Sequence, residues 1–301
     1  MNWVEIVSKI YKLKSDEEIE SFVKERIMEL ESNSEEKIIG QGYTDTFRGF
    51  IGNKVHYKAV ATIGNFVAPD LVYDDINLYV DFVKIIRDKG IMFVAILNEL
   101  FNFLNEHSKL ITEDDEVKII DRHVLYFAAR SKNINVSIKD IFKSELAMCS
   151  ERSGLVHNIF KIIGLDSELA IGYKDSQPHA YNIIFPHGYD NEPIFLYDPS
   201  EHLKFKKEDN SFSYGYFCEL SKSNYDDMLL GKPCNLNLNK TEDLYRKKSD
   251  LGNDYICEIK NFSYIIGLNN NPNKEIVNAD INNVNQLENG VDNTISNRGI
   301  K

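Results

Sequence analysis

The sequence predicts an α+β fold in which a helix that carries a cysteine packs on an antiparallel sheet that carries a histidine and an aspartate. Three observations predict it: apolar residues recur at helical spacing after Cys149, a strand-like run follows His179, and a second strand-like run ends at Asp198. We expect a mainly helical N-terminal region, this core and a disordered Asn-rich tail, at residues 1–135, 136–267 and 268–301.

The N-terminal region opens with a helix signal. Ser15 and Glu18 have the spacing of a capping box, in which each side chain accepts a hydrogen bond from the other residue's backbone N–H. The acidic helix that follows carries apolar residues every three or four positions, at Ile19, Phe22, Val23, Ile27 and Leu30. Further along, Gly52-Asn53 has the composition of a tight turn, and a β-hairpin is expected near residues 47–63.

Three more helices are expected at residues 73–88, 91–106 and 112–130. Gly90 separates the first two, and the second is apolar enough to be buried on much of its circumference. The third begins with acidic residues and ends with basic ones, which suits the helix dipole. Its apolar stripe is expected to pack in the core and consists of Val117, Ile120, Val124, Phe127 and Ala128.

The helix after Cys149 is predicted from the spacing of its apolar residues. Four of them share one face, namely Leu155, Ile159, Ile162 and Ile163. Gly164 is placed to end the helix, because glycine adopts the left-handed C′ conformation at no steric cost. Cys149 therefore falls at the helix N-terminus, where free N–H groups and the helix dipole favour a thiolate and lower the cysteine pKa.

Three strands are expected after this helix, at residues 168–173, 179–185 and 194–197. A turn at residues 175–178 joins the first two. Asp198-Pro199 is expected to end the third, because proline cannot continue a strand ladder. The second and third strands are expected to form a hairpin that sets His179 beside Asp198 on neighbouring strands. The preceding helix can then present Cys149 to the histidine.

These motifs resemble those of the transglutaminase-like superfamily, a branch of the papain-like cysteine enzymes. The likeness rests on the helix-opening Cys149, on His179-Ala180 followed by Tyr181, and on Asp198-Pro199-Ser200. The resemblance implies a papain/transglutaminase-like core and a Cys-His-Asp triad. In that triad Cys149 is the nucleophile, His179 the base and Asp198 the orienting carboxylate.

The sequence also departs from this family. Ala147 stands where the family often has glycine, and Ser150 stands where cross-linking members often have tryptophan. The chain's one tryptophan is Trp3, although an upstream tryptophan can help to bind the oxyanion in the family. These departures count against a cross-linking transglutaminase of the animal type, and they leave a triad hydrolase or acyltransferase.

Composition limits the partners and the location. The formal net charge of -12 disfavours nucleic acid and anionic membrane as partners. No metal or cofactor is expected, because no metal-ligand spacing occurs. With no signal peptide or membrane-spanning stretch, a cytoplasmic location is expected, and export by a dedicated machine stays open. The cysteines are scattered, which suits a reducing compartment, and they are Cys149, Cys218, Cys234 and Cys257.

Three other side chains are weaker site candidates. His157 lies eight residues after Cys149 in the same predicted helix, about 12 Å along its axis, which is too far for a base. His187 lies in a predicted loop and is a candidate for substrate contact. Gln41 is a guess for the second oxyanion donor, beside the backbone N–H of Cys149.

The leading hypothesis is a cysteine-dependent acyl-transfer enzyme that acts on an amide through a thioester intermediate. We favour a peptidase or amidase with a protein or peptide substrate. One alternative is a protein-amide transferase, either a transglutaminase or an acyltransferase, in which an amine replaces water. Another alternative, from a different class, is a non-catalytic binding module that retains the fold.

Overall fold

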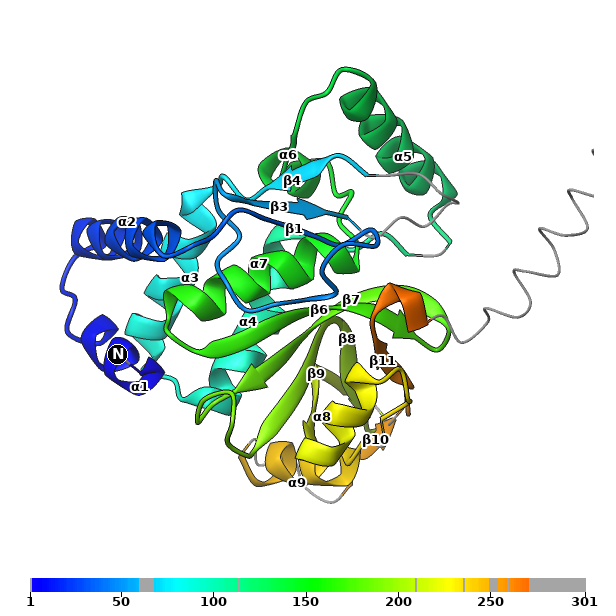
Figure 1. Ribbon diagram of the computed structural model, residues 1–301. Coiled ribbons are helices and arrows are strands. Elements are labelled where there is room, and N and C mark those ends of the chain that lie inside the picture. Colours follow the sequence, from blue (N-terminus) through cyan, green and yellow to red (C-terminus); the bar gives the residue numbers. More distant parts are fainter. Residues whose placement is uncertain are drawn as a thin grey trace, which may run out of the picture.

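The computed structural model describes residues 2–59, 68–112, 114–208, 210–234, 236–248, 254–258 and 260–270 (Figure 1). Over these residues the chain is a mixed α+β protein with two sheets and helices around them. Most of the Asn-rich tail lies outside the described residues, so the expectation of disorder there stays a prediction. The helices are α1 Trp3–Ile10, α2 Asp16–Ser32, α3 Ile76–Lys89, α4 Phe93–His107, α5 Glu116–Ser131, α6 Ile138–Lys143, α7 Cys149–Ile162, α8 Lys222–Leu229 and α9 Leu238–Lys248, with the 3-10 helix η1 Leu268–Asn270.

The larger sheet has seven strands among the described residues, and all of its pairings are antiparallel. Strands β10, β8, β7, β6 and β11 follow one another across it, while β2 adds to β6 and β9 adds to β8. The strands are β2 Thr46–Phe47, β6 Asp166–Lys174, β7 Gln177–Phe185, β8 Ile194–Lys206, β9 Ser211–Leu220, β10 Ile256–Glu258 and β11 Tyr264–Ile266. The expected hairpin of the strands that carry His179 and Asp198 is present as β7 and β8, which pair antiparallel. The turn expected at residues 175–178 joins β6 and β7 and is shorter, with Asp175 and Ser176 at positive φ and Gln177 already in β7.

The third expected strand is longer than the sequence indicates. Pro199 does not end β8, which continues to Lys206. The ladder with β9 instead shifts register between Asp198, opposite Tyr216, and His202, opposite Gly215. A bulge of this kind accommodates a proline that has no N–H to give to the ladder, and it bends the strand. The expected strand end at Asp198-Pro199 is thus wrong, because a bulge follows Asp198 and β8 continues beyond it.

A second sheet is made of four short strands in the order β1-β3-β4-β5. They are β1 Lys37–Ile39, β3 Val55–Lys58, β4 Asp70–Val72 and β5 Val136–Ser137. The chain turns at Gly52 and Asn53 as expected, but β2 pairs with β6, while β3 pairs with β1 and β4. The strands on either side of the turn therefore do not form a hairpin with each other, and residues 60–67 lie outside the described residues. Strand pairings also join the two regions that were expected to divide near residue 135.

Helix α7 lies between the two sheets (Figure 1). It packs on β6, β7 and β8 of the larger sheet, and Gly154 faces Tyr57 of β3 on the other side. Its residues from Ser150 to Phe160 are all buried, so the expected apolar face is only part of what the helix buries. Gly164 follows the helix at a φ of +76°, as its position in the sequence predicts.

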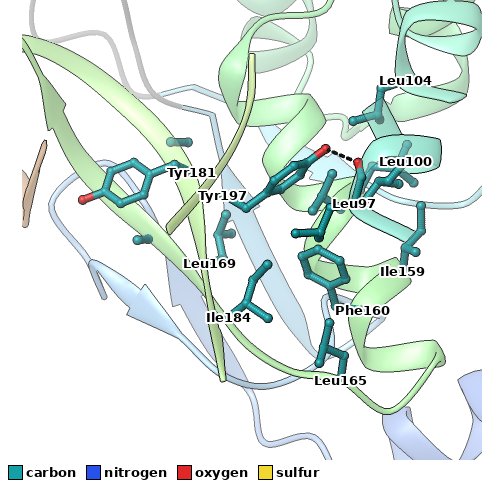
Figure 2. Close-up of a cluster of buried hydrophobic side chains, with 14 of the residues drawn as sticks. Leu97, Leu100, Leu104, Ile159, Phe160, Leu165, Leu169, Tyr181, Ile184 and Tyr197 are labelled. Carbon is teal, nitrogen blue, oxygen red and sulfur yellow. Dashed lines mark hydrogen bonds between the residues drawn. The ribbon is translucent and has the colours of Figure 1, made fainter. Parts of the chain in front are cut away.

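The main core fixes α7 on the larger sheet. Figure 2 shows leucines of α4, among them Leu97, beside Phe160 of α7 and Tyr197 of β8. The Tyr197 hydroxyl donates to the Leu97 carbonyl oxygen at 3.3 Å, so α4, α7 and β8 meet in one cluster. The expectation that residues 91–106 form a largely buried helix is confirmed by α4. This packing holds the helix that begins at Cys149 in a fixed position on the sheet.

Two expectations about the other helices have mixed outcomes. The Ser15 side chain caps α2 by accepting from the Glu18 N–H, but the Glu18 carboxylate accepts from the Lys14 N–H, so the capping box is half formed. The stripe of α5 was expected in the core, and this is wrong. Its large residues are between 60% and 69% exposed, namely Val117, Ile120, Val124 and Phe127. The buried face of α5 carries Arg122, Tyr126 and Ala129 instead.

Candidate active site

Cys149 is the first residue of α7, and its side chain is partly buried. Burial alone would raise the pKa of this thiol, but the charge of His179, a hydrogen bond with it and the Ala180 N–H together lower it. The other thiols behave differently. Burial raises the pKa of Cys218, and it raises those of Cys234 and Cys257 to about 11. Cys149 is therefore the thiol that ionises most readily among the four.

His179 lies in β7, and its imidazole is almost fully buried. Its Nε2 lies 2.7 Å from Oδ2 of Asp198, and its side chain also forms a hydrogen bond with Cys149. Burial alone would lower the pKa of His179, but the charges of Asp198 and Cys149 raise it to about 10. With the pKa of the thiol lowered and that of the imidazole raised, the arrangement favours a thiolate–imidazolium pair near neutral pH.

Asp198 is fully buried where the β8 bulge begins. Besides His179, its carboxylate accepts from the Tyr264 hydroxyl at 2.8 Å and from the Ser200 N–H at 2.9 Å. Burial would raise the pKa of Asp198, but the charge of His179 and their hydrogen bond lower it. The carboxylate is therefore held ionised and in one orientation, which fixes the imidazole ring against Cys149.

Hydrogen bonds tie the nucleophile helix to both strands of the site. The Ser153 hydroxyl donates to the Ala180 carbonyl oxygen at 2.7 Å, and Nδ2 of Asn182 donates to the Ser153 carbonyl oxygen at 3.1 Å. On the other side, Nη1 of the buried Arg152 donates to the Pro199 carbonyl oxygen at 2.9 Å. The three candidate residues thus sit on elements that are connected directly, rather than on separate loops.

A buried polar cluster supports the first turn of α7. The Glu151 carboxylate accepts from the Met148 N–H at 2.8 Å, which caps the helix. It also pairs with Arg122 of α5 at 2.7 Å and accepts from the Tyr126 hydroxyl. Burial would raise the pKa of Glu151, but the Arg122 charge and these hydrogen bonds lower it. Arg122 thereby offsets the effect of a second negative charge beside Cys149.

Two of the weaker candidates, His157 and His187, lie apart from this centre, and the guess that Gln41 is the second oxyanion donor stays a prediction. His157 is fully buried between the Gly49 carbonyl and the Ser167 hydroxyl, and burial lowers its pKa to about 3. His187 is exposed beyond the far end of β7 from His179, about 20 Å or more away at strand rise, so its expected role at the site is wrong. Gln41 donates to the Ala59 carbonyl, which ties its loop to the end of β3.

Sequence reasoning missed the residues that support the triad. Arg122 and Tyr126 lie on the face of α5 opposite to its apolar stripe, so the periodicity of the apolar residues points away from them. The role of Tyr264 depends on Asp198, a neighbour 66 residues away in the sequence. Glu151 had a detectable signal, since a carboxylate at the third position of a helix often caps it.

No family model, curated protein or solved structure matched the chain when it was compared with known proteins. Among the described residues, no group of three or more His, Cys, Asp and Glu side chains is arranged to hold a metal ion. No described helix has both the length and the apolar character that a membrane crossing needs.

Proposed function

We propose that the protein is a cysteine-dependent acyl-transfer enzyme of the transglutaminase-like, papain-like type, which hydrolyses a peptide or other amide. One observation carries the proposal. The thiol whose pKa is lowered, Cys149, is hydrogen-bonded to a histidine whose Nε2 is held by the buried carboxylate of Asp198. A thiol, an imidazole and a carboxylate from one helix and two strands lie in a chain of hydrogen bonds, and this arrangement supports a nucleophile, a base and an orienting group.

In the proposed mechanism, His179 first holds the proton of Cys149 as an imidazolium. The thiolate attacks the carbonyl carbon of the amide, an S–C bond forms, and the carbonyl electron pair moves to oxygen. The backbone N–H of Cys149, at the open end of α7, is placed to donate to that oxyanion. When the C–N bond breaks, the imidazolium gives its proton to the leaving amine, and a thioester remains on Cys149.

Water then completes the cycle in the favoured version. Neutral His179 takes a proton from water, hydroxide adds to the thioester, and the acid leaves as the thiolate is restored. Hydrolysis is preferred to transamidation because the chain's tryptophan is remote from Cys149. Trp3 donates its indole N–H to the Pro186 carbonyl oxygen at 2.8 Å, beyond the end of β7 that lies far from His179. An amine acceptor would give a protein-amide transferase from the same thioester.

The test is the alkylation of Cys149 by iodoacetamide as a function of pH, followed by intact mass and peptide mapping. In the wild type we expect one label at neutral pH, on Cys149, since the remaining thiols have raised pKa values or are buried. In His179→Ala the thiol loses its positive partner, so its pKa returns toward about 8.5 and labelling at pH 7 slows about tenfold.

Labelling with an ordinary thiol pKa that His179→Ala does not change would contradict the proposal. Since Cys149 is partly exposed, slow labelling cannot be assigned to complete burial. That outcome would favour the binding-module alternative, which also predicts that Cys149→Ala leaves the biological activity intact. Rapid labelling justifies a screen of peptide amides with water or an added amine as acceptor, which separates hydrolysis from transfer.

A further inference from the structure

The outer face of α5 carries large apolar side chains that are exposed. Four of them follow one another at steps of three, four and three residues and are between 60% and 69% exposed, namely Val117, Ile120, Val124 and Phe127. We call these four the outer stripe. Each of the other described helices presents at most one exposed large apolar side chain. Single apolar residues are ordinary on a protein surface, whereas a contiguous group of them marks a candidate interaction site.

Buried contacts on the opposite face fix α5 with this stripe outward. Arg122 pairs with Glu151 of α7 at 2.7 Å, and the Tyr126 hydroxyl donates to the same carboxylate. Turning the stripe toward the core would separate this pair and leave two buried charges without partners, which is strongly destabilising. Figure 1 shows α5 at the periphery of the molecule. The outer stripe is therefore a fixed surface of the fold rather than a core face that is loosely packed.

The spacing of the outer stripe is that of a coiled-coil seam. Alternating steps of three and four residues place Val117 and Val124 at a positions of a heptad, and Ile120 and Phe127 at d positions. A strict a/d stripe is narrower than the apolar face of an ordinary core helix, and it packs against one facing helix. A second copy of α5 presents the same seam and is therefore a geometrically suitable partner.

The charges beside the seam select the orientation of such a pair. Glu116 and Arg130 are both exposed, and each immediately precedes an a position, so they lie on the same flank at opposite ends of α5. With Val117 opposite Phe127 of the second copy, antiparallel helices bring Glu116 and Arg130 of different copies within about 3 Å along the axis. A parallel pair would set like charges together. Asp121, on the other flank, would face its own copy and weaken the pair.

We propose that the outer stripe of α5 is a homodimer interface, in which two copies of the chain pair their α5 helices antiparallel about a two-fold axis. The same patch serves on both copies, as two-fold symmetry requires. Because the patch is one helix wide, it buries less than the roughly 800 Å² per partner of a standard interface, and we expect a dissociation constant of about 10 μM or weaker. The proposal does not depend on the chemistry of Cys149.

The test is sedimentation velocity of the full chain over a concentration series from about 1 to about 500 μM, which spans the expected dissociation constant. In the wild type we expect the sedimentation coefficient to rise with concentration from monomer to dimer. Val124→Glu places a carboxylate in the middle of the seam on both copies, so it should weaken the dimer at least tenfold. Met28→Glu is the matched control, because Met28 is 62% exposed on another helix, α2, and its dimerisation should stay within about twofold of the wild type.

Charge reversal tests the antiparallel orientation. Glu116→Lys and Arg130→Glu each set like charges against one another at both ends of the pair, so each should weaken the dimer about threefold or more at low salt. The double variant restores opposite charges across the interface and should return the dissociation constant to within about twofold of the wild type. Urea midpoints measured at monomeric concentration should stay the same in all of these variants, because the substituted side chains are exposed. If Val124→Glu lowers its midpoint, Val117→Gln takes its place.

Every other outcome overturns the proposal. A wild-type chain that stays monomeric over the whole series has no such interface. A dimer that Val124→Glu leaves intact uses another surface, and an equal loss in Met28→Glu would show a general effect of added charge. A double variant that stays as weak as Glu116→Lys and Arg130→Glu would exclude the antiparallel pairing. None of these results bears on the reactivity of Cys149, so the proposed function would stand or fall separately.

Discussion

The carboxylate of Asp198 has three donors around it: the His179 imidazole and the Tyr264 hydroxyl at one oxygen, and the Ser200 N–H at the other. None of these three bonds carries the proton that the mechanism moves, because that proton passes between Cys149 and the imidazole nitrogen that does not bond Asp198. Because the group is fully buried, its charge is poorly screened, and it acts strongly on the protonation of His179. The pKa of Cys149 therefore depends on a residue that it does not touch.

Asp198→Asn should shift the pH dependence of Cys149 alkylation upward. The negative charge of Asp198 helps to raise the pKa of His179 to about 10, so its removal lowers that pKa, and a less protonated imidazole stabilises the thiolate less. The thiolate–imidazolium pair exists above the pKa of Cys149 and below that of His179. Labelling at pH 7 should then fall about tenfold, while near pH 10, where any thiol is ionised, the two proteins should label at similar rates.

Tyr264→Phe is the control for this prediction. It removes a neutral donor from the same Asp198 oxygen and leaves the charge in place. We expect its alkylation profile to stay within about threefold of the wild type at every pH. A shift in Tyr264→Phe as large as that in Asp198→Asn would show that orientation of the carboxylate, rather than its charge, controls the thiol.

At the scale of the element, α7 is constrained from both sides, and Gly154 shows how closely. Alanine in a helix interior is usually better than glycine by about 1 kcal/mol. Here a Cβ would fall 1.9 Å from the Tyr73 hydroxyl oxygen and 2.3 Å from the ring carbon that bears it. We expect Gly154→Ala to lower the free energy of unfolding by about 1–3 kcal/mol, measured by urea denaturation, because the tyrosine must move.

A double-mutant cycle identifies the cause. Tyr73→Leu shortens the side chain that the new methyl group meets, so it should cost less in the Gly154→Ala background than in the wild type. Additive effects would mean that Gly154→Ala acts elsewhere. A stabilised Gly154→Ala protein would mean that β3 and β4 approach α7 less closely than described.

The elements also show why sequence reasoning succeeded in some places and not in others. Helix α7 was predictable because the spacing of its apolar residues and the position of Gly164 indicate the same C-terminal end. Strands β6 and β7 were predictable because an apolar run lies on each side of a turn. The second sheet was not predicted, because its strands have only two to four residues, which is too few to show an alternating pattern. For α5, periodicity indicated an apolar face but could not show whether anything covers it.

The candidate site was predictable in part for a similar reason. Local pattern places Cys149, His179 and Asp198 at the ends of expected elements, and this was enough to single them out. In the structure Cys149 does open α7, but His179 is the third residue of β7 and Asp198 lies inside β8. The supporting contacts join residues that are far apart in the sequence. Arg122 and Glu151 are separated by 29 positions, and the sequence around either residue does not indicate that the other is its partner. Buried ion pairs of this kind follow from the tertiary packing and were therefore missed.

At the scale of the whole molecule, the end of the described chain returns to the candidate site. Strand β11 pairs with β6, where Ile266 lies opposite Gly172, which in turn lies opposite His179 of β7. A Cβ on Gly172 would lie 1.9 Å from the Ile265 carbonyl oxygen, so the glycine permits this approach. The same strand brings Tyr264 to Asp198. Strand β11 thus covers the edge of β6 beside the candidate site.

Two truncations test this arrangement. A chain that ends at Asn270 keeps β11 and loses an Asn-rich segment with few aromatics, so its free energy of unfolding should stay within about 0.5 kcal/mol of the full chain. A chain that ends at Asn261 also loses three fully or nearly fully buried side chains, those of Tyr264, Ile265 and Ile266. At about 1.5–3 kcal/mol for each large apolar side chain, that loss approaches the total stability of an ordinary domain.

Urea unfolding and Cys149 alkylation, measured on both truncated chains, should therefore separate them. We expect the chain ending at Asn270 to match the full chain in both, and the chain ending at Asn261 to unfold at much lower urea and to lose selective labelling. If the shorter chain keeps its stability and its thiol reactivity, β11 is dispensable and Asp198 needs no donor from it. If the longer one is already destabilised, residues 271–301 contribute to the fold, against the expectation from their composition.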